Sequence, residues 1–376
     1  MIFRLLDLYI QDCYIARKPT GAPTEDAGTT RAGPPAGGAV RDTKGARQCR
    51  CRSGSWGIKG GAGRALGWLA TLALAAGAGG AQAQTTKVAL GMSGWTGFAP
   101  LTLAAKAGIF EKHGVEVDIK MIPQKDRHLA LASGAIQCAA TTVETHVAWN
   151  ANGVPITQIV QLDKSYGADG LAVRSDVKSF ADLKGKTIGV DAPGTAPYFG
   201  LAWMLKKNGM TIKDVKTTTL SPQAAAQAFV SGQNDAAMTY EPYLSTVRQN
   251  PEKGKILATT LDYPMVMDTL GCTPKWLKDN PKAAQALVDG YFEALEMIRK
   301  DPAKSNEIMG AAVKQTAEQF AKSASYLRWQ DREANRKFFA GELAEFSKEA
   351  AAVLLDVGVI RKVPDVTGLY DPRFIR

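Results

Sequence analysis

The sequence is poor in the residues from which catalytic and metal sites are usually built. The 376-residue chain has three histidines and five cysteines, and His113, His128 and His146 are not spaced like metal ligands. We expect His128 and His146 on the surface or in loops. Gly185-Lys186-Thr187 resembles the end of a P-loop, but Phe180 replaces the required glycine and the segment precedes a predicted strand. No nucleophile and base can be paired, so we predict a protein that is not an enzyme and has no catalytic residue, metal or cofactor.

The apolar run near the N-terminus is too short to cross a membrane. Lys59 and Arg64 precede the apolar run at 65–76, and Ala81-Gln82-Ala83 follows it. A positive flank, a short apolar core and an Ala-x-Ala end form a secretory signal, whereas a transmembrane helix needs about 20 apolar residues. We predict a signal peptide at 59–83, cleavage after Ala83 and a periplasmic mature protein. Residues 1–58, rich in Gly, Pro and Arg, are expected to be disordered and to lie upstream of the true translation start.

Concentrated basic charge is missing from most of the chain. The formal net charge is +10, but 11 of the 46 basic and 5 of the 36 acidic residues lie within 1–83. The remaining chain has 35 basic and 31 acidic residues, a net charge of +4, with both signs interspersed. A nucleic-acid-binding protein typically shows a basic stripe. No nucleic-acid partner is therefore expected.

Two cysteines, Cys138 and Cys272, remain after the predicted signal peptide. In an oxidising compartment they could form one disulfide. Spacing alone does not show such a bond, and we expect two buried thiols.

From Lys87 onward, short β-type runs alternate with amphipathic helices. This alternation is typical of mostly parallel sheets covered by helices on both faces. Both halves open with a strand, a Gly/Thr/Pro loop and a helix, which predicts two similar α/β lobes. We expect one lobe at 84–170 and 263–376, the other at 171–262, and short crossings near 166–175 and 261–272. The expected strands are 88–92, 115–121, 137–143, 157–162, 187–191, 215–220, 235–239 and 256–260, and the expected helices are 100–110, 195–207, 223–230 and nearly all of 281–358.

Four loops follow predicted strands, at the sheet edge where open α/β proteins bind ligands. They cover 93–98, 141–145, 191–198 and 239–242. The loops offer glycines for close backbone approach, hydroxyl groups and flat aromatic faces, although Gly and Thr could merely cap helices there. The residues that we predict to bind a ligand are Ser93, Gly94, Trp95, Thr96, Gly97, Thr141, Thr142, Glu144, Asp191, Gly194, Thr195, Tyr198, Tyr240 and Glu241.

Charged residues near these loops leave the sign of the ligand open. Glu144 and Glu241 favour a cation if they face the cleft, but each could simply complement a helix dipole. Lys125 and Arg127, near the start of a helix, favour an anion, although such charges are usually solvated.

Several segments, in their order and spacing, resemble substrate-binding proteins of the nitrate/sulfonate/taurine ABC transporters, a group that includes proteins for pyrimidine precursors of thiamine. The resemblance covers about 86–376 and implies a two-lobed periplasmic binding protein fold (type II), with two mixed, mostly parallel sheets, two hinge strands and the C-terminal helices on the first lobe. It implies a monomer that captures a small solute and docks on an ABC permease powered by an ATPase. Positions Trp95, Thr142, Thr195 and Tyr240 match ligand contacts of the family. The segments are 94–96 with 100–117, 130–137, 182–190, 233–237 with 240–243, and 356–360 with 370–374.

Two departures from the family pattern put a sulfonate in doubt. Many relatives have Trp or a small residue where this chain has Glu241 before Pro242, and the second loop carries Glu144. The family binds sulfonates, nitrate, bicarbonate or pyrimidine precursors, and a cationic or nitrogen-rich solute (an amine, guanidinium or pyrimidine) is the alternative. An exported sensor on the same fold is a second alternative. A cytosolic pyrimidine-making enzyme is disfavoured, because the chain has an export signal but no Cys-rich motif and no paired histidines.

Overall fold

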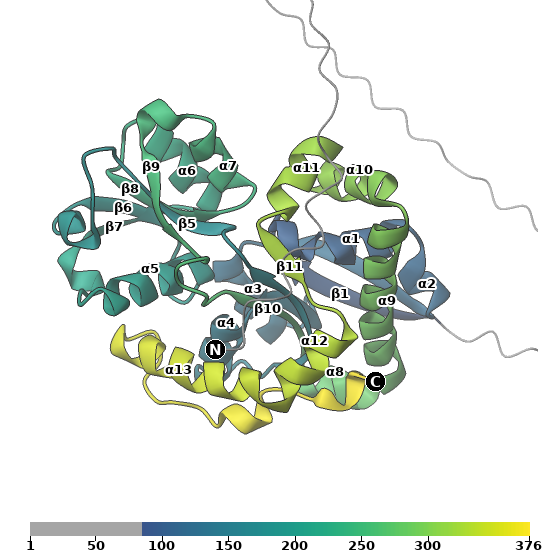
Figure 1. Ribbon diagram of the computed structural model, residues 1–376. Helices are drawn as coiled ribbons and strands as arrows, with labels where there is room; N and C mark the ends of the chain where they lie inside the picture. Colours follow the sequence, from purple (N-terminus) through teal and green to yellow (C-terminus); the bar gives the residue numbers. More distant parts are fainter. Residues whose placement is uncertain (1–84) are drawn as a thin grey trace, which may run out of the picture. The chain divides into compact units, whose positions relative to one another are not determined.

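The computed structural model describes residues 85–376 (Figure 1). The predicted leader and signal peptide, residues 1–83, lie outside this range. Within it, no helix combines the length and the apolar character that crossing a membrane requires.

Residues 85–376 contain two β-sheets. The first has the strand order β11-β4-β10-β3-β1-β2, and the second has the order β7-β6-β8-β5-β9. The strands of the first sheet are β1 (Thr86–Met92), β2 (Val115–Met121), β3 (Cys138–Thr142), β4 (Thr157–Ser165), β10 (Met267–Cys272) and β11 (Leu327–Trp329). Those of the second are β5 (Asp169–Val173), β6 (Thr187–Val190), β7 (Lys216–Thr219), β8 (Ala236–Tyr240) and β9 (Lys255–Thr259).

Both sheets are mixed, which confirms the predicted fold class, but antiparallel pairings are more frequent than predicted. β1 is parallel to β2 and β3, whereas β10 is antiparallel to β3 and β4, and β11 to β4. β6 is parallel to β7 and β8, whereas β5 is antiparallel to β8 and β9. Parallel neighbours need a helical crossover. β5 and β10 instead follow directly on the crossings between the sheets, at 166–168 and 260–266, and enter their sheets in the opposite direction.

Helices cover these sheets in four apolar clusters, of which two are large. Around the first sheet, α1, α2, α9 and α10 pack together, with Phe110 and Tyr291 fully buried between them. The second core joins α5 to the last helix, α13, which also contacts α4 (Figure 1). α13 therefore packs on helices of both sheets, and not on the first lobe alone. The helices are α1 (Ala99–Lys106), α2 (Ile109–Lys112), α3 (Gln124–Ala132), α4 (Val143–Ala151), α5 (Ala196–Lys207), α6 (Pro222–Val230), α7 (Tyr243–Arg248), α8 (Pro274–Asp279), α9 (Pro281–Lys300), α10 (Pro302–Ala312), α11 (Ala317–Ala324), α12 (Arg332–Lys337) and α13 (Leu343–Asp356), with a π-helical turn at Phe338–Glu342.

Residues 281–358 are nearly all helical, as predicted, apart from turns and the three-residue strand β11 at the edge of the sheet. Two local predictions were wrong. The helix expected at 100–110 is interrupted at Gly108, whose φ of 70° ends α1 and precedes α2. His146, expected on the surface, is fully buried in α4, where its Nδ1 lies 3.0 Å from Thr269 Oγ1. Burial lowers its pKa to about 3, so the ring is neutral at physiological pH.

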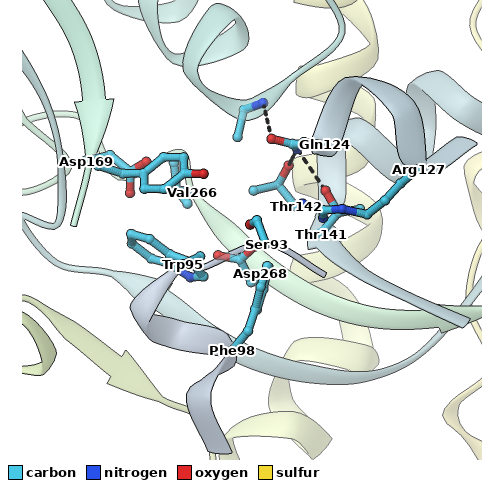
Figure 2. A pocket seen from close by; sticks show the side chains of 12 residues that line it. Ser93, Trp95, Phe98, Gln124, Arg127, Thr141, Thr142, Asp169, Val266 and Asp268 are labelled. Carbon is cyan, nitrogen blue, oxygen red and sulfur yellow. Dashed lines mark hydrogen bonds between the residues drawn. The ribbon is translucent and has the colours of Figure 1, made fainter. Parts of the chain in front are cut away.

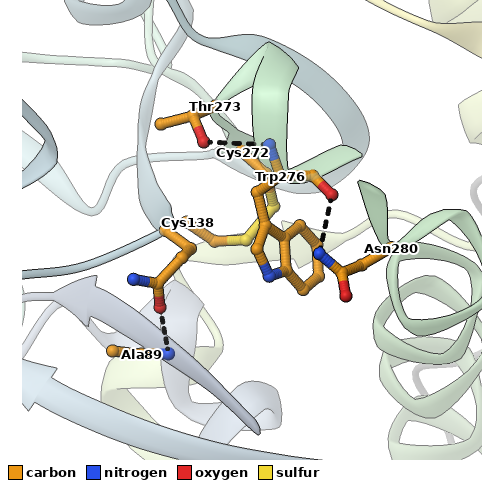
Figure 3. The surroundings of a disulfide bond; sticks show 7 residues. Ala89, Cys138, Cys272, Thr273, Trp276 and Asn280 are labelled. Carbon is orange, nitrogen blue, oxygen red and sulfur yellow. Dashed lines mark hydrogen bonds between the residues drawn. A yellow bond between two sulfur atoms is a disulfide. The ribbon is translucent and has the colours of Figure 1, made fainter. Parts of the chain in front are cut away.

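Cys138 and Cys272 form a disulfide, contrary to the expectation of two thiols (Figure 3). They are partners in the antiparallel pairing of β3 with β10, and both are fully buried. The strand register that brings them together joins segments 134 residues apart, so the spacing in the sequence contained no sign of it.

We expect the disulfide to stabilise the fold substantially. Replacing both cysteines with alanine should lower the free energy of unfolding by about 2–4 kcal/mol, because the bond constrains a long loop of the unfolded chain. Urea denaturation monitored by circular dichroism measures the change. Dithiothreitol should lower the midpoint of the unaltered protein and leave that of the double variant unchanged. Equal midpoints for the oxidised protein and the double variant would contradict the expectation.

Candidate functional site

A small cavity lies where the two sheets face one another (Figure 2). All four predicted loops contribute residues to its wall. The cavity is tight. The volume that the centre of a water molecule can occupy inside it is about 20 Å³. Its lining residues are Ser93, Trp95, Phe98, Gln124, Arg127, Thr141, Thr142, Asp169, Ala196, Tyr240, Val266 and Asp268.

Gln124 connects the two sides of the cavity. It is the first residue of α3, which follows β2, and it is buried. Its Nε2 donates to the hydroxyls of Thr141 (2.8 Å) and Thr145 (2.9 Å). Its Oε1 accepts a hydrogen bond from the backbone N–H of Ala196 (3.2 Å), the first residue of α5 beside the second sheet. This amide therefore joins the start of α5 to the end of β3.

Arg127 is buried in the cavity wall, so the expectation of a solvated side chain was wrong for this residue. Its exposed fraction is 1%. Nε donates to the carbonyl of Ile122 (2.9 Å) and Nη1 to that of Ala140 (2.6 Å), while Nη2 has no partner among the described residues. Burial lowers the pKa of the guanidinium to about 10, which leaves it charged at neutral pH. Lys125, in contrast, is exposed as expected.

Aromatic rings from both sheets meet at the other side of the cavity. The rings of Trp95, which follows β1, and Tyr240, which ends β8, pack edge to face with centroids 5.4 Å apart. The indole Nε1 donates to Asp163 (3.1 Å). A Cβ at Gly97 would lie 2.2 Å from Asp163 Oδ2 and 2.3 Å from the indole nitrogen. Glycine at position 97 is therefore required for this packing.

Four buried carboxyl groups lie in or behind the cavity wall. Asp169 and Asp268 line it, Asp163 lies behind Trp95, and Glu144 bonds to the hydroxyls of Thr142 and Thr145. Burial raises the pKa of Asp169 to about 7 and those of Asp163 and Glu144 to about 8. The pKa of Asp268 is also raised, first by burial and then by the adjacent charge of Asp163.

Of the predicted site residues, Ser93, Trp95, Thr141, Thr142 and Tyr240 line the cavity. Glu241 serves a local structural purpose: it accepts a hydrogen bond from the Ser245 backbone N–H (3.1 Å), and Arg248 Nε lies 3.2 Å away. The Thr195 hydroxyl bonds to its own loop at Ala192. The predicted residues outside the lining are Gly94, Thr96, Gly97, Glu144, Asp191, Gly194, Thr195, Tyr198 and Glu241.

The lining residues that the prediction omitted are Phe98, Gln124, Arg127, Asp169, Ala196, Val266 and Asp268. Phe98 and Ala196 fall within the predicted loops, and Arg127 was noted as a charge. Asp169 and Asp268 lie at the starts of antiparallel strands, where no sequence motif identifies them. Across residues 85–376, no group of three or more His, Cys, Asp or Glu side chains is arranged to hold a metal ion.

The buried carboxyls should make stability depend on pH. The folded protein holds the Asp169 proton up to about pH 7, whereas the unfolded chain releases it near pH 4. The contribution of this group to the free energy of unfolding is therefore full at about pH 4 and is lost as pH rises to about 7. Between these pH values, the melting temperature of the unliganded Asp169→Asn variant should decline less than that of the unaltered protein. The exposed control, Asp176→Asn, should follow the unaltered protein, and identical declines in all three would contradict the assignment.

Comparison with known proteins places this fold and site in a family. A family model described as "NMT1/THI5 like" matches residues 95–305. One relative is a protein of Brucella abortus that is provisionally named a binding protein. It is 26% identical to this chain over 219 residues, which are 56% of this chain and 66% of that protein. The match thus spans slightly less than two thirds of that relative's length.

Solved structures show the same fold at low sequence identity. The periplasmic aliphatic sulphonate-binding protein SsuA from Escherichia coli has a TM-score of 0.64 at 19% identity, covering 76% of this chain and 92% of that chain. The periplasmic nitrate-binding protein NrtA from Synechocystis PCC 6803 has a TM-score of 0.61 at 20% identity, covering 76% and 84%. Because the family match covers more than half of the sequence, this chain belongs to the NMT1/THI5-like family.

Proposed function

We propose that this chain is the solute-binding component of an ABC importer. It captures one small polar solute in the cavity between the two sheets and delivers it, in the periplasm, to a membrane permease driven by a separate ATPase. Relatives with this fold are named for binding sulfonates and nitrate, which supports a small polar cargo. The protein acts as a monomer with two lobes, as its family resemblance implies.

The observation that carries the proposal is that both sheets supply the cavity wall. The Gln124–Ala196 hydrogen bond and the Trp95–Tyr240 ring contact each pair a residue beside the first sheet with one beside the second. A solute in this position contacts both sides at once and so stabilises the closed arrangement. Closure of two lobes about short crossings is a known response of binding proteins to their ligands.

The contents of the cavity also favour binding over catalysis. Its hydroxyl groups from Thr141 and Thr142 are occupied by hydrogen bonds with Gln124, Thr145 and Glu144. Neither histidine nor cysteine is among the lining residues. The available groups are those that orient a solute: a guanidinium, carboxyls and aromatic faces.

Trp95→Ala should weaken solute binding roughly tenfold, because it removes an aromatic contact of about 1.4 kcal/mol. A thermal-shift screen of the purified protein against sulfonates, nitrate, amines, guanidinium compounds and pyrimidines first identifies a solute, since binding to the native state raises the melting temperature. Calorimetry then gives the affinity.

The matched control is Trp95→Phe. It loses the N–H that donates a hydrogen bond to Asp163. Because it keeps an aromatic face, its affinity for the solute should lie close to that of the unaltered protein. Equal affinities for the unaltered protein and Trp95→Ala would remove the ring from the site. Failure of every compound to raise the melting temperature would count against a solute-binding function.

A further inference from the structure

Two carboxyl groups face the cavity without a full set of partners. Asp169 and Asp268 line it, each with an exposed fraction of 2%. The Oδ2 atoms of both have no hydrogen-bond partner among the described residues. A buried carboxylate without a partner is costly. Both side chains line the cavity, although the Asp268 carboxyl also lies against that of Asp163.

The one basic residue of the lining does not neutralise these groups. Two of the three guanidinium nitrogens of Arg127 donate to backbone carbonyls, and the charge of Asp268 acts on Arg127 without a direct hydrogen bond between the two. In Figure 2, Asp169 and Arg127 lie on opposite sides of the cavity, with Ser93 and Asp268 between them. The Asp169 side therefore has an excess of negative charge when its carboxyls are ionised.

The aromatic rings also favour a cationic group on the Asp169 side of the cavity. Trp95 lies on the same side of the cavity as Asp169 in Figure 2, and its ring packs against Tyr240. The face of an indole attracts a cation, and the attraction grows when both groups are removed from water. Carboxylates beside aromatic faces suit a protonated nitrogen with N–H donors.

The opposite side of the cavity offers hydrogen-bond donors. Arg127 Nη2 is buried and has no partner among residues 85–376. The Gln124 amide in the same wall already donates to Thr141 and Thr145, so the guanidinium nitrogen is the donor that remains free. An oxygen acceptor on the solute would satisfy the free guanidinium nitrogen.

We infer that the solute carries a protonated nitrogen, bound by Asp169 and Asp268 beside Trp95, and an oxygen-bearing end, bound by Arg127. This inference rests on the proposed function and narrows it. A plain anion such as nitrate or an alkylsulfonate would supply the oxygen atoms only. It would leave the Oδ2 atoms of Asp169 and Asp268 without a partner, and its charge would lie close to theirs once these carboxyls are ionised.

The test uses pairs of solutes that differ by one ammonium group. Taurine is compared with ethanesulfonate, β-alanine with propionate, and 4-aminobutyrate with butyrate. The thermal-shift screen also includes nitrate, guanidinium compounds and other amines, and calorimetry measures each hit with the unaltered protein. Members that carry a protonated nitrogen should bind at least tenfold more tightly than their partners.

The outcomes separate this inference from the proposed function. Hits confined to solutes with a protonated nitrogen support both. Hits among nitrate, ethanesulfonate or other plain anions, with equal or weaker binding of the ammonium members, overturn the inference and leave the solute-binding function intact. The absence of any hit across all classes counts against both.

Asp169→Asn tests the assigned contact directly. It keeps the shape of the side chain and removes its charge, so it should weaken binding of the nitrogen-bearing hit at least tenfold. The control is Asp176→Asn, whose carboxyl is 70% exposed and should leave the affinity unchanged. Asp268→Asn replaces the first variant if that one fails to fold. Unchanged affinity in a folded variant overturns the inference.

Discussion

The arrangement of the cavity depends on the two short segments, 166–168 and 260–266, by which the chain crosses between the sheets. β5 begins at Asp169, directly after the first crossing, and β10 begins at Met267, directly after the second. Asp169 and Asp268, the carboxyls of the cavity wall, are thus the first and second residues of these strands. A change in the angle between the sheets acts at the crossings, and it therefore moves the two carboxyls relative to each other. Under the proposed function, a solute that binds both carboxyls would couple its charge to this motion.

The cavity combines groups that are fully bonded with groups that are not. Two nitrogens of Arg127 are bonded to backbone carbonyls, which fixes the direction of the third. Gln124 is held by two hydroxyls and the start of α5. The carboxyls of Asp169 and Asp268 are rigidly placed but incompletely satisfied. Such preorganised groups reduce the side-chain entropy that the protein loses on binding a small solute, because the side chains are already ordered.

From the sequence, the position of the cavity could be predicted better than the set of residues that line it. Strand periodicity and the Gly-rich loops located Ser93, Trp95 and Tyr240, because the residues after a strand end necessarily reach that edge of the sheet. Asp268 and the Cys138–Cys272 disulfide depend instead on the register of β10 against β3, which joins distant segments. The burial of His146 depends on packing of α4 against β10. None of these long-range relations leaves a periodic pattern in the sequence.

The acidic residues illustrate why a family fold does not determine a ligand. Glu144 and Glu241 would favour a cation only if they faced the cavity, and neither lines it. Glu241 is occupied by the Ser245 N–H at the start of α7 and by Arg248. The carboxyls that face the cavity come from β5 and β10, which belong to the framework shared with sulfonate- and nitrate-binding relatives. The shared fold alone therefore does not determine the charge of the solute.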